Sequence, residues 1–425
     1  MNLIKNIILG IDGGCFNHLE PLLKRNLLPN FKKIISNGFS SKLRVTIPPT
    51  TIPSWPCIFS GVTPNQLGMH YFDHPIKGLF NSSLWKNKAI FSNPTLRSFV
   101  LNVPGTFPPW NINGEMISGM LSPSLACVPQ SLTEHIKDKW IVDGRDIPEV
   151  FKTFEIKKKI FLEKINKKFN LLIYVIRSPD VCSHLTVPKD PKEILKNIFI
   201  SYIKIDRMLG EILEHEDIDN IIIVSDHGLK HYSRVIHMNR WLEKKGFLFL
   251  NKGGSKLFRS IFNKLFGIIS TNLRFSFKLI NMLKEKFNIP TEKIKHLGTT
   301  AAKVISQSPS NVGVLLLHGE LALKKNSIET ELKKERWVKN TFSIISERLT
   351  ELFIVLQDNY LFSGLPSRFV KMRGDYIEHS QYGFFIANGK NFRTKEVDVI
   401  NYFNIAPTVL KLFNIEKKEY MIGNS

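Results

Sequence analysis

The chain has 425 residues, 43% of them hydrophobic, and its 59 Lys and Arg against 37 Asp and Glu give a net charge of +22. This is ample for a large globular core in one domain with an insertion, and four cysteines without a CxxC pair exclude a disulfide framework. The charge indicates attraction to an anionic partner, whether nucleic acid, a membrane surface or a phosphorylated substrate.

The first predicted element is a strand over residues 6–11, a nearly continuous apolar run that ends in Asp12 and two glycines. Such runs are typical of buried strands in a parallel sheet, and ligands of these sheets bind beyond the carboxyl ends of the strands. The run is too short for a signal peptide, and no stretch reaches the roughly 18 apolar residues of a membrane span. We therefore expect a cytoplasmic protein with reduced, mostly buried cysteines.

The stretch Ile47–Gly61 contains two hydroxyls, Thr50 and Thr51, just before Pro53 and an apolar run of helical length. Because Pro favours the first turn of a helix, we expect Thr51 at or just before a helix N-terminus, where free N–H groups favour a phosphoryl oxygen. A Thr hydroxyl is a poor nucleophile unless a metal activates it. The alternative is that both threonines only cap a helix.

The remaining pattern predicts alternating helices and strands. Further helices are predicted over 18–37 with an interruption at Pro29, and over 148–168, 194–215, 239–245, 327–352 and 404–412. Further strands are predicted over 40–46, 99–103, 170–176, 221–224 and 383–387, and strand-like texture over 299–319. A short apolar run over 116–123 ends in a turn. We therefore expect an α/β fold, a three-layer α/β/α sandwich with a mostly parallel central sheet.

Residues 246–298 differ in texture from the rest, because apolar residues recur at helical spacing among many Lys and Arg and few acids. We interpret 246–298 as an inserted basic helical cap on a core formed by 1–245 and 299–425. It is either an ordinary amphipathic segment packed on the core or a basic surface that contacts an anionic membrane peripherally.

Two further apolar strands also end in metal-binding side chains: one leads to Asp180 and His184, the other directly into Asp226 and His227. His379 precedes the strand over 383–387. With Asp12 and Thr51, these residues supply three carboxylates, three imidazoles and a hydroxyl. This mixture suits two divalent metals, Zn²⁺ most readily, with Mn²⁺ or Mg²⁺ as alternatives. Two such metals roughly 4 Å apart can clamp an in-line phosphoryl displacement.

In these motifs the chain resembles the type I phosphodiesterase/nucleotide pyrophosphatase branch of the alkaline phosphatase superfamily, and its uncharacterised prokaryotic members in particular. The resemblance runs nearly end to end. It is carried by Ile8–Gly13, Pro48–Pro56, Asn102–Pro109, Ile117–Pro123, Val224–Gly228 and Gly383–Ala387. Leu67 stands where relatives have His before a Gly, a position that is not a ligand in the family.

The resemblance implies a role for each residue of the constellation. Asp12, Thr51, Asp226 and His227 would hold one metal, and Asp180, His184 and His379 the other. Thr51 would attack phosphorus, forming a phospho-threonine intermediate that water then hydrolyses. Ser54 would bind a phosphoryl oxygen.

We therefore expect a two-metal hydrolase of phosphodiester or pyrophosphate bonds that acts on a small-molecule or lipid-linked phosphoester. A phosphomonoesterase or phosphomutase using the same metals is the alternative, disfavoured because no Arg stands beside Thr51 in the sequence. A non-enzymatic protein that binds membrane or nucleic acid is a third reading, supported only by the diffuse charge. We predict no specific nucleic-acid partner.

Overall fold

The computed structural model describes residues 4–74, 78–138, 140–141, 143–186, 190–247, 310–317, 320–345, 350–363 and 369–425. The chain divides into two compact units, Met1–Lys230 with His379–Ser425, and His231–Glu378. The predicted cap over 246–298 lies outside the described residues from 248 onward, so it stays a prediction. Among the described residues, no helix combines the length and apolarity that a bilayer span requires.

The first unit is built on a nine-stranded sheet, counted over the described residues. In spatial order its strands are β17 (Lys395–Asn401), β2 (Phe39–Arg44), β16 (Tyr382–Gly389), β9 (Asn220–Val224), β1 (Asn6–Ile11), β8 (Leu171–Ile176), β5 (Ser98–Val103), β6 (Gly114–Ser118) and β7 (Cys127–Val128). The central run β9–β1–β8–β5–β6 is parallel, and β16 and β7 are antiparallel to their neighbours. This confirms the predicted α/β fold with its mostly parallel sheet.

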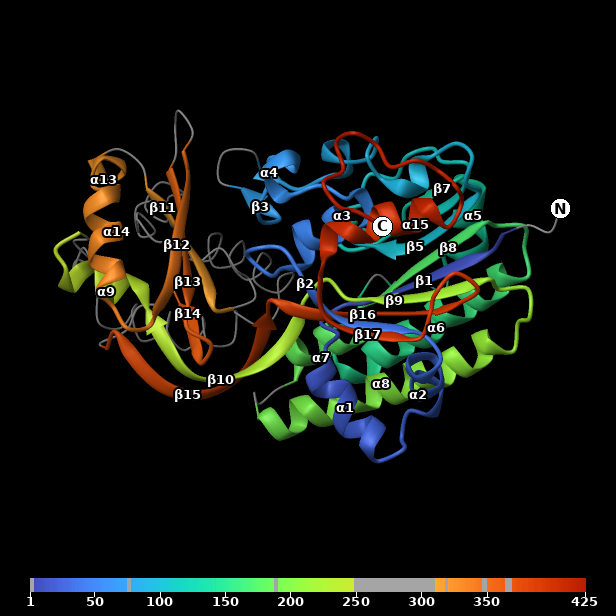
Figure 1. Ribbon diagram of the computed structural model, residues 1–425, viewed down its shortest axis with the longest axis horizontal. Helices are drawn as coiled ribbons and strands as arrows, with labels where there is room; N and C mark the ends of the chain where they lie inside the picture. The colour runs from blue at the N-terminus through green and yellow to red at the C-terminus, as the bar shows by residue number, and fades with distance from the viewer. Residues whose placement is uncertain are drawn as a thin grey trace. The chain divides into compact units, whose positions relative to one another are not determined.

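Helices cover both faces of this sheet, so the unit has three layers (Figure 1). One face carries α1 (Phe16–Lys24), α2 (Pro29–Ser36), α6 (Ile147–Ile165), α7 (Ser178–Leu185) and α8 (Pro191–Leu213), and the other carries α3 (Thr51–Ser60) and α15 (Ile405–Lys411). The helix predicted over 18–37 is indeed interrupted, because Pro29 begins a new helix at a position where its missing N–H is harmless.

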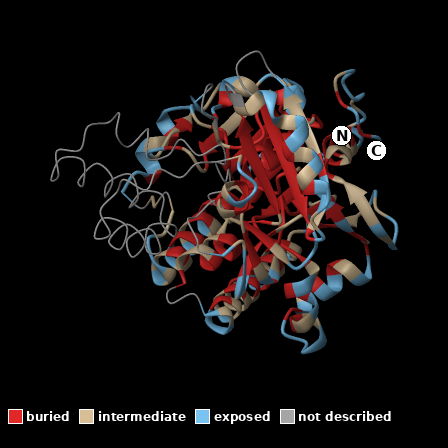
Figure 2. Cartoon of the chain, turned by 90° about the vertical axis from the view of Figure 1, so that its left-hand side faces the viewer, coloured by how far each residue is buried: buried red, intermediate tan, exposed pale blue. Residues whose placement is uncertain are grey.

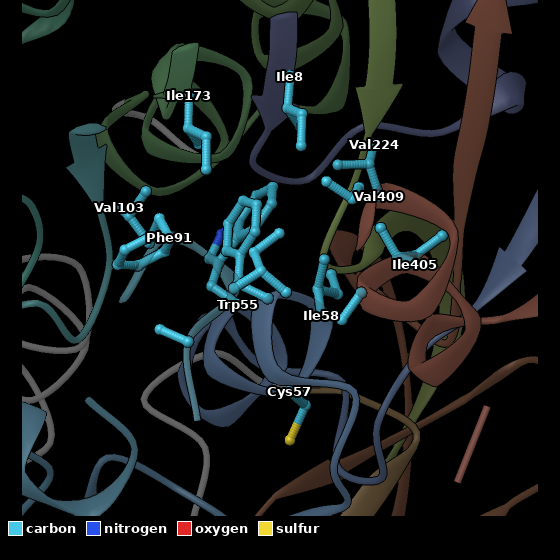
Figure 3. Packing of buried hydrophobic residues seen from close by; sticks show 14 of the residues in the cluster. Ile8, Trp55, Cys57, Ile58, Phe91, Val103, Ile173, Val224, Ile405 and Val409 are labelled. Carbon is cyan, nitrogen blue, oxygen red and sulfur yellow. The ribbon is translucent and has the colours of Figure 1, made fainter. Parts of the chain in front are cut away.

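The central strands are buried along their whole length, as continuous apolar runs require (Figure 2). Alternate residues of neighbouring strands, such as Ile8 and Ile173, face the same side and pack under Trp55 of α3 (Figure 3). A Cβ added at Gly10 of β1 would lie 2.5 Å from Trp55 Cη2. Gly10 therefore lets α3, which carries Thr51, approach the sheet closely.

The second unit has its own sheets and its own core. Its strands are β10 (Gly228–His237), β14 (Tyr360–Ser363) and β15 (Lys371–Ser380) in one sheet, and β11 (Val312–Leu317), β13 (Thr350–Leu356) and β12 (Val338–Ile345) in another. The unit boundaries fall within β10 and β15. The apolar core includes side chains of α9 (Met238–Lys244) and α14 (Lys325–Lys333).

The helix predicted over 327–352 is wrong. Helix α14 ends at Lys333, and β12 and β13 follow as an antiparallel pair. The many charged residues of 327–339 favoured the prediction of a solvent-exposed helix. The short β-branched and aromatic segment of β12, with Thr341, Phe342 and Ile344, was given too little weight. The four cysteines are free and buried, as expected.

Candidate metal centre and nucleophile

The parallel register of the central strands brings three chain segments to one edge of the sheet. Ile11 of β1 pairs with Ile176 of β8, and Gly10 pairs with Val224 of β9. The residues that follow each strand therefore emerge side by side. After β1 comes Asp12, after β8 the turn into α7, and after β9 the Asp-His pair.

Asp12, Asp226 and His227 form the first group of potential ligands. The His227 Nε2 atom lies 3.2 Å from Asp12 Oδ1 and 3.3 Å from Asp226 Oδ2. The ligand atoms of this group lie within 4.8 Å of one another, and all three side chains are fully buried. The Gly13 N–H donates to Asp226 Oδ1 at 3.3 Å, whereas Asp226 Oδ2 is buried without a hydrogen-bond partner. Such a carboxylate oxygen is costly unless a cation binds it.

Asp180, His184 and His379 form the second group. Asp180 and His184 stand four residues apart on α7, which places both on one face of the helix. Asp180 Oδ1 lies 3.2 Å from His184 Nε2 and 3.0 Å from His379 Nε2, and the two Nε2 atoms are 3.2 Å apart. His379 was expected just before a strand; it lies within β15, one residue before the end of that strand.

His227 links the two groups. Its ring stacks on that of His379 with the centroids 3.7 Å apart, and Asp180, His227 and His379 also place ligand atoms within 4.8 Å of one another. Asp180 and His379 are buried, while the His184 side chain keeps 24% of its surface exposed. The second group is therefore the one that opens toward solvent.

Thr51 lies beside the first group. Its Oγ1 is 3.4 Å from Asp12 Oδ1 and 3.4 Å from His227 Nε2. Thr51 opens α3, but the backbone of Ile52 is not helical and the regular turns follow it. The Thr50 hydroxyl donates to the Ile52 carbonyl and makes no cap, so the reading of both threonines as mere helix caps has no support here.

The histidine orientations fit a metal. The Nδ1 atoms of His227 and His379 face backbone carbonyls, Gly228 O at 3.2 Å and Pro49 O at 3.0 Å. A carbonyl only accepts, so a neutral ring in either position carries its proton on Nδ1 and leaves a lone pair on Nε2. Both Nε2 atoms face carboxylate oxygens, which are acceptors too. Lone pairs that converge in this way are stabilised by a cation between them.

The charge of the carboxylates supports the same conclusion. Burial raises the pKa of Asp226 well above its ordinary value, and the neighbouring carboxylates of Asp12 and Asp180 raise it further. Three carboxylates this close do not all stay ionised on their own. Divalent cations favour the ionised forms, and the oxygen and nitrogen donors present are those that Zn²⁺ and Mn²⁺ accept.

The His227 imidazole has the complementary pKa shift. Burial lowers the pKa of His227, and His379 lowers it further, which keeps the His227 ring neutral as a metal ligand requires. Burial raises the pKa of Asp180, but the electrostatic and hydrogen-bonding interactions of this carboxylate with His184 and His379 outweigh that effect and hold the pKa well below its usual range. A metal ion at this place would act on Asp180 in the same direction.

Arg177 is part of the site, and the sequence reasoning missed it. Its Nε donates to Asp12 Oδ2 at 3.0 Å, its Nη1 donates to Asp143 Oδ2 at 2.8 Å, and its Nη2 lies 3.9 Å from Asp180 Oδ2. Burial opposes its charge, but Asp143, Asp12 and Asp180 raise its pKa above the ordinary value. The signal was available, because Arg177 follows β8 as Asp12 follows β1.

Ser54 lies in the first turns of α3 and is fully buried. Its hydroxyl is 2.5 Å from Thr46 Oγ1, which itself donates to the Pro48 carbonyl. Ser54 thus donates to Thr46 in this arrangement, and its role in binding a phosphoryl oxygen stays a prediction. Of the other predicted residues, Asp12 and His227 lie beside Thr51, and the second group adjoins them through the stacked rings of His227 and His379.

Comparisons with known proteins identify the fold and the family of this chain. The sequence model described as Type I phosphodiesterase / nucleotide pyrophosphatase matches residues 6–367. A search of curated proteins found no match. Among solved structures, human ectonucleotide pyrophosphatase/phosphodiesterase 5 has a TM-score of 0.57 at 16% identity over 99% of this chain and 97% of its own. The murine protein has a TM-score of 0.58 at 15% identity over 98% and 96%. At such identities the structures show the shared fold, and the family match, which covers most of the sequence, shows that this chain belongs to the type I phosphodiesterase/nucleotide pyrophosphatase family.

Proposed function

We propose that this protein hydrolyses phosphodiester or pyrophosphate bonds with two divalent metals, Zn²⁺ first among them, and with Thr51 as nucleophile. The observation that carries the proposal is the position of Thr51 Oγ1, 3.4 Å from Asp12 Oδ1 and from His227 Nε2, at the edge of two ligand groups. Asp12, Asp226 and His227 would hold one ion together with Thr51, and Asp180, His184 and His379 the other.

Divalent ions in these places would act as Lewis acids that lower the pKa of the Thr51 hydroxyl and neutralise charge on the phosphoryl group. The Thr51 Oγ1–P bond forms as the bond from phosphorus to the leaving oxygen breaks, and the proton lost by Thr51 is balanced by the one that the leaving oxygen gains. Water then forms a new O–P bond, the Oγ1–P bond breaks, and the proton that this water loses is balanced by the one that Thr51 Oγ1 regains. The N-terminal end of α3 presents its positive dipole to the transferring group.

The comparisons support a nucleotide-like substrate. The name of the family refers to phosphodiesterase and nucleotide pyrophosphatase activities. One similar structure is murine ectonucleotide pyrophosphatase/phosphodiesterase 5, as an inactive threonine-to-alanine variant in complex with AMP, at 15% identity and a TM-score of 0.55 over 98% of this chain and 96% of its own. We therefore place nucleotide derivatives first, and activated sugars or lipid-linked phosphoesters second.

Arg177 bears on the choice between diesters and monoesters. A monoester carries more negative charge than a diester and gains more from a free guanidinium. Arg177 is the arginine that lies at the site among the described residues, and its donors are directed at Asp12 and Asp143. This favours diesters over the phosphomonoesterase or phosphomutase alternative.

The test is hydrolysis of bis-p-nitrophenyl phosphate and of p-nitrophenyl phosphate by protein loaded with Zn²⁺, Mn²⁺ or Mg²⁺. We expect diester hydrolysis in the wild type, its loss in Thr51→Ala and His379→Ala, and its retention in Thr50→Ala. Thr50 is the matched control, because its hydroxyl is bonded to the Ile52 carbonyl.

Preference for the monoester would replace the diester assignment, and full activity of Thr51→Ala would refute the mechanism. Salt-dependent binding to anionic vesicles without turnover of any phosphoester would favour the non-enzymatic reading. That outcome would be assigned to the basic residues 246–298 only if their deletion abolished it.

A further inference from the structure

The two oxygens of Asp12 face different partners, and those of Asp180 do the same. The inner oxygen of each, Oδ1, faces imidazole nitrogen: Asp12 Oδ1 lies 3.2 Å from His227 Nε2, and Asp180 Oδ1 lies 3.0 Å from His379 Nε2. The outer oxygen of each, Oδ2, faces Arg177, at 3.0 Å for Asp12 and 3.9 Å for Asp180. One guanidinium thus lies behind one carboxylate of each ligand group.

Arg177 is itself held from behind. Its Nη1 donates to Asp143 Oδ2 at 2.8 Å, and the side chains of Arg177 and Asp143 are 11% and 34% exposed. A small pocket, lined by Asp143, Asn102 and Lys157 among others, lies against Arg177. Without Asp143, the guanidinium would lose the carboxylate that holds its Nη1 in place.

We propose that Arg177 is a positioning residue for both metals, which turns the Oδ1 atoms of Asp12 and Asp180 toward the ions, and that Asp143 anchors it. The inference rests on the two-metal assignment of the proposed function, but not on hydrolysis. A guanidinium has a rigid fork of donors that can fix more than one carboxylate, whereas an ammonium group is a point charge on a flexible stem. Partners behind metal ligands orient them in this way in many sites.

Charge and geometry make opposite predictions here, which makes the proposal testable. A positive charge beside a cation site weakens cation binding by Coulomb repulsion. If Arg177 acted through charge alone, its removal would leave metal binding equal or tighter. If it positions the carboxylates, its removal weakens metal binding even though a like charge is lost.

The experiment titrates metal-free, full-length protein with Zn²⁺ against a chromophoric chelator and measures the dissociation constant at each site. For Arg177→Gln and for Arg177→Lys we expect a rise of about 10-fold or more at both sites, as is usual for such partners. Asp143→Asn should show a smaller rise in the same direction. Arg145→Gln is the matched control: it removes an exposed arginine near Asp143 whose Nε lies 3.9 Å from Glu149, and it should bind Zn²⁺ as the wild type does.

Wild-type affinity in Arg177→Lys, together with equal or tighter binding in Arg177→Gln, would overturn the proposal. Circular dichroism of the metal-free proteins checks folding, and if Arg177→Gln fails to fold, Arg177→Lys and Asp143→Asn decide. If Zn²⁺ affinity depends on Arg177 but the protein cleaves no phosphoester, only the proposed function is refuted. Hydrolysis with unchanged affinity in these variants would refute only the inference.

Discussion

Lys157 is a buried cation whose pKa predicts a measurable dependence of stability on pH. It lies in α6 with 2% of its surface exposed, and its Nζ donates to Asn102 Oδ1 at 2.9 Å and lies 4.7 Å from the centre of the Trp140 ring. Burial lowers its pKa from 10.5 to about 8; the charge of Asp143 opposes this shift, and that of Arg177 adds to it. Substitution by Met keeps an unbranched side chain, one atom shorter than that of Lys, and removes the charge.

The magnitude follows from the difference between the folded and unfolded pKa values. At about 1.4 kcal/mol for each pKa unit, a fall from 10.5 to about 8 costs the folded protein about 3 kcal/mol at pH 7. Below pH 8 the amine is protonated in both states and the whole penalty is present. Between pH 8 and 10.5 the unfolded chain binds more protons than the folded one, so the penalty disappears as the pH rises.

The assay is urea unfolding of the wild type and Lys157→Met at pH 7 and pH 10. Met also removes the hydrogen bond to Asn102, which costs about 1 kcal/mol at every pH. We expect the stability of Lys157→Met relative to the wild type to fall by about 2 kcal/mol between pH 7 and pH 10. Lys159→Met, on the exposed side of the same helix, should show no such change. A difference between Lys157→Met and the wild type that is constant with pH would refute the reasoning.

Three further predictions concern the glycines and the ions that shape the site. Gly13 has φ +72°, and a Cβ added there would lie 3.2 Å from Asp180 Cβ. Gly13→Ala should therefore lower the free energy of unfolding by roughly 1–2 kcal/mol and weaken Zn²⁺ binding. Wild-type values in both measurements would contradict this prediction. Gly10→Ala should destabilise by about 1–3 kcal/mol in urea unfolding, because the new Cβ would overlap Trp55 at 2.5 Å, and a stability equal to the wild type would show that α3 can move away freely. Zn²⁺ added to chelator-treated protein at 100 times its dissociation constant should raise the free energy of unfolding by about 2.7 kcal/mol per site, and an unchanged melting temperature would show that no such site exists in the folded chain.

The central strands and the residues at their ends could be predicted because a strand buried on both faces requires a continuous run of apolar residues. The apolar runs before Asp12, Asp180 and Asp226 are typical of buried strands at that length. Since ligands of a parallel sheet lie beyond the carboxyl ends of its strands, these acids could be assigned to one site from the amino-acid pattern alone. Thr51 was found for a similar local reason, the proline that follows it.

Pairing between distant segments was harder to predict. The antiparallel pair β12–β13 was read as helix because its charged flank, from Lys333 to Lys339, outweighed a short alternation. Arg177 follows β8 as Asp12 follows β1, but no pattern within either segment predicts its pairing with Asp143. This pairing depends on the register of β1 against β8 and on the position of the segment before α6, which contains Asp143. Both are set by tertiary contacts.

The most direct test of the central claim is a crystal structure of the Zn²⁺-loaded protein with anomalous difference maps recorded at the zinc edge. We expect two peaks roughly 4 Å apart beside Thr51 Oγ1, one bound by Asp12, Asp226 and His227 and the other by Asp180, His184 and His379. Full loading without a peak at these residues, or with peaks only elsewhere on the chain, would contradict it.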